Sequence, residues 1–241
     1  MTPLLPIADL EVFLSTRDSL HQVAEHVVAK ARFVDDGRVE LTAFANGFAT
    51  PMLASARRVR VDGVDVVIDD ASGSRRSALT TIADAAAFVG VEAGFPTELY
   101  AAASPLQPGV ALRVDRGSAD ALAAWFGFSG EVLAQFATEI VDGDPSSLVL
   151  WPEHFDLAFF TSEGDESRRA NYGASPGDAG HPEPYLYVGP FETVDEHEFW
   201  NATHFNGAVL PLSRLVGADA PFEIALQFLR SGHSHLKADG D

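Results

Sequence analysis

The stretch RRVRVDGVDVVID, residues 57–69, decides the fold class. Apolar and charged residues alternate on both sides of Asp62-Gly63, and a period of two is typical of strands that bury one face. Asp-Gly between two such runs predicts a two-residue hairpin turn. The register that this turn implies pairs three sets of residues: Val61 with Val64, Val59 with Val66, and Arg60 with Asp65. The sheet is therefore expected to be antiparallel.

The rest of the chain repeats this pattern of hairpins and helices. Asn46-Gly47 predicts a second hairpin between residues 38–45 and 48–53. A short helix is expected at 8–16 and a longer one at 20–31, begun by Ser15 or Thr16. Apolar residues with helical spacing predict further helices at 81–89, 118–126, 129–140 and 221–232. Further strands are expected at 148–151, 155–161, 168–172, 183–188 and 203–210. The fold class is therefore α+β, with antiparallel sheets and flanking helices.

A cluster of turn residues, DGDPSS at 142–147, predicts a domain boundary. The two parts are 1–143, with a helix, hairpins and a helical section, and 144–241, with a sheet and a terminal helix; one continuous domain is the alternative. FANGFATP (44–51) and FNGAVLP (205–211) share Asn-Gly and a proline after three intervening residues. This echo indicates either two related halves or two unrelated turns.

Composition excludes several classes of function. The chain of 241 residues has no cysteine, so thiolate nucleophiles, disulfides and cysteine metal sites are absent. Its net charge of −19 disfavours nucleic acid and membrane surfaces as partners. Nucleotide-binding signatures are missing, and neither Lys30 nor Lys237 suits pyridoxal phosphate. Without a leader or an apolar segment of about 20 residues, the protein is expected to be soluble and cytoplasmic.

Aromatic, histidine and carboxylate residues concentrate between residues 147 and 190. A strand through this region puts His154 and Asp156 on one face, and a second strand puts Glu183, Tyr185 and Tyr187 on one face. The predicted ligand-binding residues are Trp151, His154, Asp156, Tyr172, Ser175, Asp178, Glu183, Tyr185 and Tyr187. Candidate ligands for a divalent metal are His154, Asp156, His181 and Glu183. A solvent-facing strand and an ordinary turn produce the same spacing.

His21 and Glu25 lie four residues apart on the predicted helix 20–31, and His26 follows. This spacing lets the His21 and Glu25 side chains meet on the helix surface. A partly exposed pair is the favoured interpretation, and a ligand pair is the alternative, because H-x-x-x-E by itself is common.

Several blocks of the sequence resemble a family of uncharacterised bacterial proteins common in high-GC actinobacteria. They are LWPEHFDLA (150–158), RANYGASPGD (169–178), EPYLYVGP (183–190) and FW (199–200). The likeness continues through SLHQVAEHV (19–27) and LTTIADAAAFVGV (79–91), so it covers nearly the whole chain. The family has no known activity, so the resemblance implies membership and assigns no site residue.

Three functions are consistent with these residues. The first is a small-molecule or cation-binding protein with a polar-aromatic pocket in residues 150–206, which Trp200, His204 and Asn206 would close. The second is a metal-assisted hydrolase or isomerase that uses the candidate metal ligands. The third is a structural or interaction module. The sequence leaves open whether the protein is an enzyme, what it binds and its oligomeric state.

Overall fold

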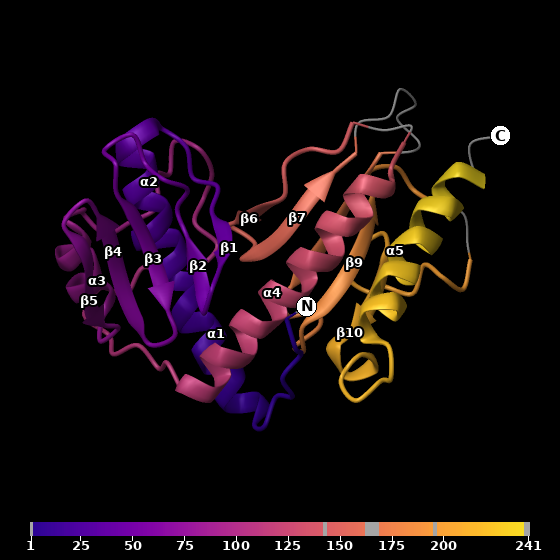
Figure 1. Cartoon of the computed structure of the whole chain (residues 1–241), viewed down its shortest axis with the longest axis horizontal. Coiled ribbons are helices and arrows are strands. Elements are labelled where there is room, and N and C mark those ends of the chain that lie inside the picture. Colours follow the sequence, from indigo (N-terminus) through magenta and orange to yellow (C-terminus); the bar gives the residue numbers. More distant parts are fainter. Residues whose placement is uncertain (1, 142–143, 162–168, 195–196, 239–241) are drawn as a thin grey trace. The chain divides into compact units, whose positions relative to one another are not determined.

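The computed structural model describes residues 2–141, 144–161, 169–194 and 197–238 (Figure 1). Contacts divide the chain into two compact units. The N-terminal unit contains Leu5–Gly127 and Val149–Phe155, and the C-terminal unit contains Met1–Leu4, Phe128–Leu148 and Asp156–Asp241. The boundary predicted after residue 143 falls at residues 142–143, outside the described part of the chain, and it stays a prediction.

The N-terminal unit contains a five-stranded antiparallel sheet whose strands follow chain order. The strands are β1 (Thr42–Phe44), β2 (Gly47–Ala49), β3 (Arg58–Asp62), β4 (Asp65–Asp70) and β5 (Gly73–Ala78). Both predicted hairpins are present, as β1–β2 and β3–β4. This sheet, with the helices and the second sheet described below, confirms the α+β class with antiparallel pairing.

The predicted register of the β3–β4 hairpin is wrong. Asp62 pairs with Asp65, so the turn is Gly63-Val64, and Arg60 pairs with Val67 instead of Asp65. Gly63 has a φ of +61°, which suits the type II′ turn that places glycine first. The two registers keep every side chain on the same face, so the alternation of residues cannot distinguish them. The observed register brings the Arg60 guanidinium within 2.8 Å of Asp62 and Asp69.

A continuous helical run precedes this sheet. It consists of α1 (Leu10–Val23), a π-helix (Ala24–Val28) and α2 (Ala29–Asp36). Asp9 caps its start, since the Asp9 carboxylate accepts hydrogen bonds from the backbone of Glu11 at 2.9 Å and Val12 at 3.2 Å. The predicted start at Ser15 or Thr16 is therefore wrong.

The helix predicted at 81–89 is confirmed as α3 (Ile82–Val89), capped by Thr81. The helices predicted at 118–126 and 129–140 are wrong as separate elements, because α4 (Arg116–Glu139) is continuous. Gly130 stays within the helix for a packing reason. A Cβ there would lie 3.3 Å from Leu157 Cδ2, so glycine permits a close approach between α4 and its neighbour in the C-terminal unit.

The second antiparallel sheet has the strand order β10-β9-β8-β7-β6. Its strands are β6 (Val149–Trp151), β7 (Asp156–Phe160), β8 (Ala170–Ser175), β9 (Tyr185–Pro190) and β10 (Ala208–Pro211). On one face, Phe136 of α4 contacts Phe159 and Tyr172, with ring centroids 6.2 and 5.0 Å apart. Tyr172 also contacts His233 of α5 (Pro221–Ala238), so both helices cover this face.

The predicted end of the last helix at Gly232 is wrong, since α5 continues to Ala238. Gly232 is buried, and a Cβ there would lie 2.7 Å from Val188 Cγ2 of β9. Glycine is therefore required by the approach of α5 to the sheet, and it does not end the helix. No described helix has both the length and the apolar character that crossing a membrane requires.

Replacing Gly232 with alanine should destabilise the protein. At an exposed helical position this change gains about 1 kcal/mol, but here the new methyl group overlaps Val188, and overpacking costs about 1–3 kcal/mol. We expect a lower free energy of unfolding in urea for Gly232→Ala. Ser234→Ala, at an exposed position of the same helix, is the control. A Gly232→Ala protein as stable as the control would contradict the proposed packing role.

Candidate functional site

Four residues of the predicted site meet in the C-terminal unit. The register of β7, β8 and β9 puts Asp156, Tyr185 and Tyr187 on one face of the sheet. The Tyr187 hydroxyl donates a hydrogen bond to Asp156, and the Tyr185 hydroxyl donates to Asp178 at 2.5 Å. Asp156 is buried, so the structure forms two tyrosine–carboxylate pairs side by side.

A glycine makes the first pair possible. Gly173 of β8 lies opposite Tyr187 of β9, and a Cβ at this position would lie 2.5 Å from the Tyr187 ring. The ring can therefore lie across the β8 backbone, which lets its hydroxyl reach Asp156 on the strand beyond.

Asp178 organises the turn between β8 and β9. Its carboxylate accepts hydrogen bonds from the backbone N–H groups of Gly180 at 2.6 Å and His181 at 2.8 Å. Burial by itself would raise the pKa of Asp178, but the hydrogen bonds from Tyr185 and this backbone outweigh it, so the pKa is lowered. This is the geometry of an ordinary Asx turn, the structural alternative for this loop.

The two tyrosines are held as neutral hydrogen-bond donors. Burial, followed by the Asp178 hydrogen bond, raises the pKa of Tyr185. Burial, followed by the charge and the hydrogen bond of Asp156, raises the pKa of Tyr187. Because both hydroxyl protons are already donated to carboxylates, these pairs are suited to fixing the sheet and poorly suited to proton transfer with a ligand.

No three of the predicted metal ligands are grouped together in the described part of the chain. His181 Nε2 lies 3.9 Å from Glu183 Oε1. The Glu183 carboxylate instead accepts hydrogen bonds from the Ser213 N–H at 3.0 Å and hydroxyl at 3.1 Å. Within the described ranges, no three His, Asp or Glu side chains are grouped to hold a metal ion. The metal set therefore gains no support from the geometry.

The other predicted residues have separate surroundings. Trp151 and the exposed His154 belong to the N-terminal unit, in β6 and in the turn that follows it. The strand begins only at Asp156, after Phe155 with a φ of +52°, so the expected alternation of His154 and Asp156 along one strand is wrong. Tyr172 is fully buried and its hydroxyl lies 3.0 Å from His233 Nδ1, while Ser175 accepts a hydrogen bond from the Gly177 N–H.

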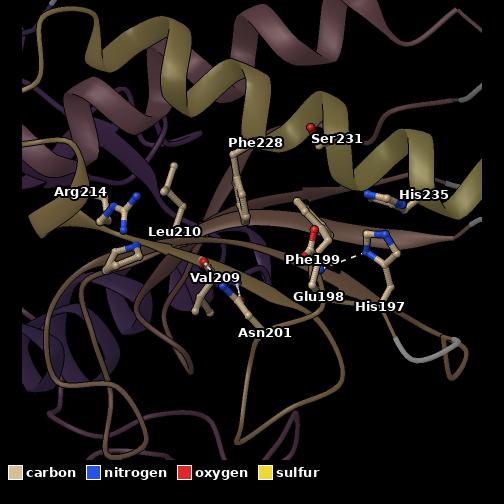
Figure 2. Close-up of a pocket in the computed structure, with 11 residues that line it drawn as sticks. His197, Glu198, Phe199, Asn201, Val209, Leu210, Arg214, Phe228, Ser231 and His235 are labelled. Carbon is tan, nitrogen blue, oxygen red and sulfur yellow. Dashed lines mark hydrogen bonds between the residues drawn. The ribbon is translucent and has the colours of Figure 1, made fainter.

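A pocket of about 590 Å³ lies in the C-terminal unit, between α5, β10 and the segment before β10 (Figure 2). Its wall contains a row of contacting rings, with centroids 4.2–5.4 Å apart between neighbours. The eleven lining residues are His197, Glu198, Phe199, Asn201, Val209, Leu210, Pro211, Arg214, Phe228, Ser231 and His235. None of the nine predicted ligand-binding residues is among them.

The sequence indicated only some of the residues that line this pocket. His197 and Glu198 fall in an acidic, histidine-rich run, but their spacing matches no metal template. His235 lines the pocket because α5 continues past Gly232, and Ser231 lines it from the preceding turn of the same helix (Figure 2). The Asn201 side chain is hydrogen-bonded to the backbone of Val209. Its Oδ1 accepts from the Val209 N–H at 2.8 Å, and its Nδ2 donates to the Val209 carbonyl at 3.2 Å.

A separate polar cluster lies inside the N-terminal unit. Glu25 and His26 are 0% and 1% exposed, so the predicted partly exposed pair with His21 is wrong. The Glu25 carboxylate accepts hydrogen bonds from the N–H groups of Ala103 and Ser104, both at 2.8 Å, and from the Ser104 hydroxyl at 2.5 Å. The π-helix thereby fastens the long connection that follows α3.

His26 is hydrogen-bonded to the same connection. Its Nδ1 accepts a hydrogen bond from the Phe95 N–H at 3.2 Å, so the proton of the neutral ring is on Nε2, which donates to the Ser104 carbonyl at 3.0 Å. This tautomer cannot take a proton from the Ser104 hydroxyl through Nε2. The three residues therefore form a structural network, and the geometry of a serine nucleophile with a histidine base is absent.

His21 lies beside this network. Its ring stacks on Phe155 with centroids 5.2 Å apart, and Nε2 donates to the Pro152 carbonyl at 2.8 Å. Burial lowers the pKa of His21, although the charge of Glu25 raises it. His21 is therefore a packed neutral side chain.

No family model, curated protein or solved structure matches this chain. The resemblance to an actinobacterial family thus stays a prediction.

Replacing Glu25 with glutamine should weaken the N-terminal unit. The amide NH₂ group would face the Ala103 or Ser104 N–H, leaving buried donors without acceptors, at a cost of about 1–3 kcal/mol. We expect a lower free energy of unfolding in urea and faster hydrogen exchange at the Ser104 amide. The control is Glu11→Gln, at an exposed position of α1. Equal stability of the two variants would show that the buried carboxylate is dispensable.

The lowered pKa of Asp178 makes stability depend on acidity. A carboxyl with a depressed folded-state pKa stabilises the protein above its unfolded value, near 3.8, and this contribution disappears as pH falls through the folded value. Wild type should therefore lose stability below about pH 4 more steeply than Asp178→Asn in thermal unfolding. Glu192→Gln, at an exposed position, should follow wild type. Parallel pH profiles for all three proteins would contradict the assignment.

Proposed function

We propose that this chain is a small-molecule-binding protein and that the ligand occupies the pocket between α5 and β10. The observation that carries the proposal is the row of aromatic and imidazole rings on the pocket wall, Phe228, Phe199, His235 and His197 (Figure 2). Exposing apolar rings to water costs free energy that a flat ligand would recover by covering them. A volume of about 590 Å³ falls within the range of pockets for small organic ligands.

The other polar clusters support a binding role less well. The hydroxyls of Tyr185 and Tyr187 are donated internally, and Glu25 and His26 are buried against backbone. A ligand would have to break these bonds before it could form its own. The pocket differs because apolar ring surface there borders an open volume, so binding requires no such loss.

The test uses naphthalene-2-methanol, a neutral aromatic probe, and saturation-transfer NMR. Ser231 faces the pocket, so Ser231→Trp should fill it and abolish the saturation transfer that wild type gives. Ser234→Trp, on the exposed side of the same helix, adds the same side chain outside the pocket and should leave the transfer unchanged.

Absence of transfer in wild type would overturn the proposal. So would equal transfer in the Ser231→Trp and Ser234→Trp proteins, because the probe would then bind elsewhere. Thermal unfolding of both variants checks that each remains folded.

A further inference from the structure

Arg214 is an exposed cation among the residues that line the pocket. The protein has 35 acidic and 16 basic residues, so most basic side chains have carboxylates available. Arg230 in the same unit pairs with Glu139 at 2.7 Å and Glu223 at 2.8 Å. By contrast, the Arg214 guanidinium forms no ion pair or hydrogen bond with any residue in the described part of the chain. Arg214 lines the pocket and is exposed, so a ligand can bind its guanidinium without breaking a bond to the described part of the chain.

The position of Arg214 makes the two ends of the pocket different. Arg214 ends the short 3₁₀ helix Leu212–Arg214, which directly follows β10. Figure 2 shows Arg214 at one end of the pocket and His197 with His235 at the other, with Phe228 and Leu210 between them. A ligand along the pocket would therefore meet a cation first and ring surfaces next.

The opposite end favours a ligand with a single negative charge. Glu198 lines the pocket beside Phe199, away from Arg214 (Figure 2). Its carboxylate would repel a second anionic group placed near His197. A molecule with one carboxylate and a flat apolar body fits this arrangement, because planar carboxylates match the two-pronged guanidinium and rings match the aromatic wall.

We propose that the pocket selects aromatic monocarboxylates, with the carboxylate on the Arg214 guanidinium and the ring against Phe199 and Phe228. The inference rests on the proposed function, since it names the ligand class of the same pocket. Arg214 is then the residue that determines specificity, and the ring wall supplies affinity that does not depend on charge.

The test compares 2-naphthoate with naphthalene-2-methanol, two probes with the same ring system that differ in charge. Dissociation constants come from NMR titration at low salt. We expect wild type to bind 2-naphthoate about threefold to fivefold more tightly, the factor that a solvent-exposed charge pair contributes. The preference should decrease as salt is added, because salt screens the pair.

Three variants isolate the role of Arg214. Arg214→Gln should abolish the preference and leave the affinity for the neutral probe unchanged, while Arg214→Lys should retain part of it. Arg113→Gln removes one positive charge at an exposed position in the N-terminal unit and should keep the full preference. Thermal unfolding of each variant confirms that the fold is intact.

The outcomes separate the inference from the proposed function. Equal binding of both probes to wild type, or a preference that survives Arg214→Gln, overturns the inference and leaves the pocket as a small-molecule site. Absence of binding by either probe, or binding that Ser231→Trp does not reduce, overturns the proposed function and the inference together.

Discussion

Two polar side chains without access to water, Glu25 and His26, are the constraint on which the N-terminal unit depends. A buried polar group must be hydrogen-bonded, and both residues satisfy this by binding the backbone of the connection after α3. That connection has little regular structure, so it would otherwise lose many backbone conformations on folding. The π-helix contains both residues, and both of their side chains are buried.

The same rule explains why the richest stretch of the sequence is a weak candidate for ligand chemistry. Asp156 and Asp178 accept hydrogen bonds from two tyrosines, and Glu183 binds Ser213. These groups are used to hold strands and turns together, so few are available to a ligand. The pocket has the opposite character. It combines uncovered rings with the Arg214 guanidinium, and its surroundings offer that cation no partner within the described chain.

Three glycines show how packing overrides a local signal. Glycine often ends a helix, yet Gly130 and Gly232 lie inside α4 and α5 because each lets its helix approach the sheet closely. Gly173 serves the same purpose within the sheet, under the Tyr187 ring. Sequence inspection predicts a helix end at Gly232 and gives no reason for the other two glycines, because the atoms that require all three belong to distant residues: Leu157, Val188 and Tyr187.

The sequence by itself determined the α+β class, the two N-terminal hairpins and the capped helix α3, because two-residue and 3.6-residue periods and turn residues act over a few neighbours. Only the tertiary structure decided the register of β3–β4, the lengths of α4 and α5, the burial of Glu25 and the place of the pocket. Each of these depends on contacts between distant residues, such as Glu25 with Ser104, 79 positions apart. Periodicity specifies which face of an element is apolar, and it does not specify which surface that face will meet.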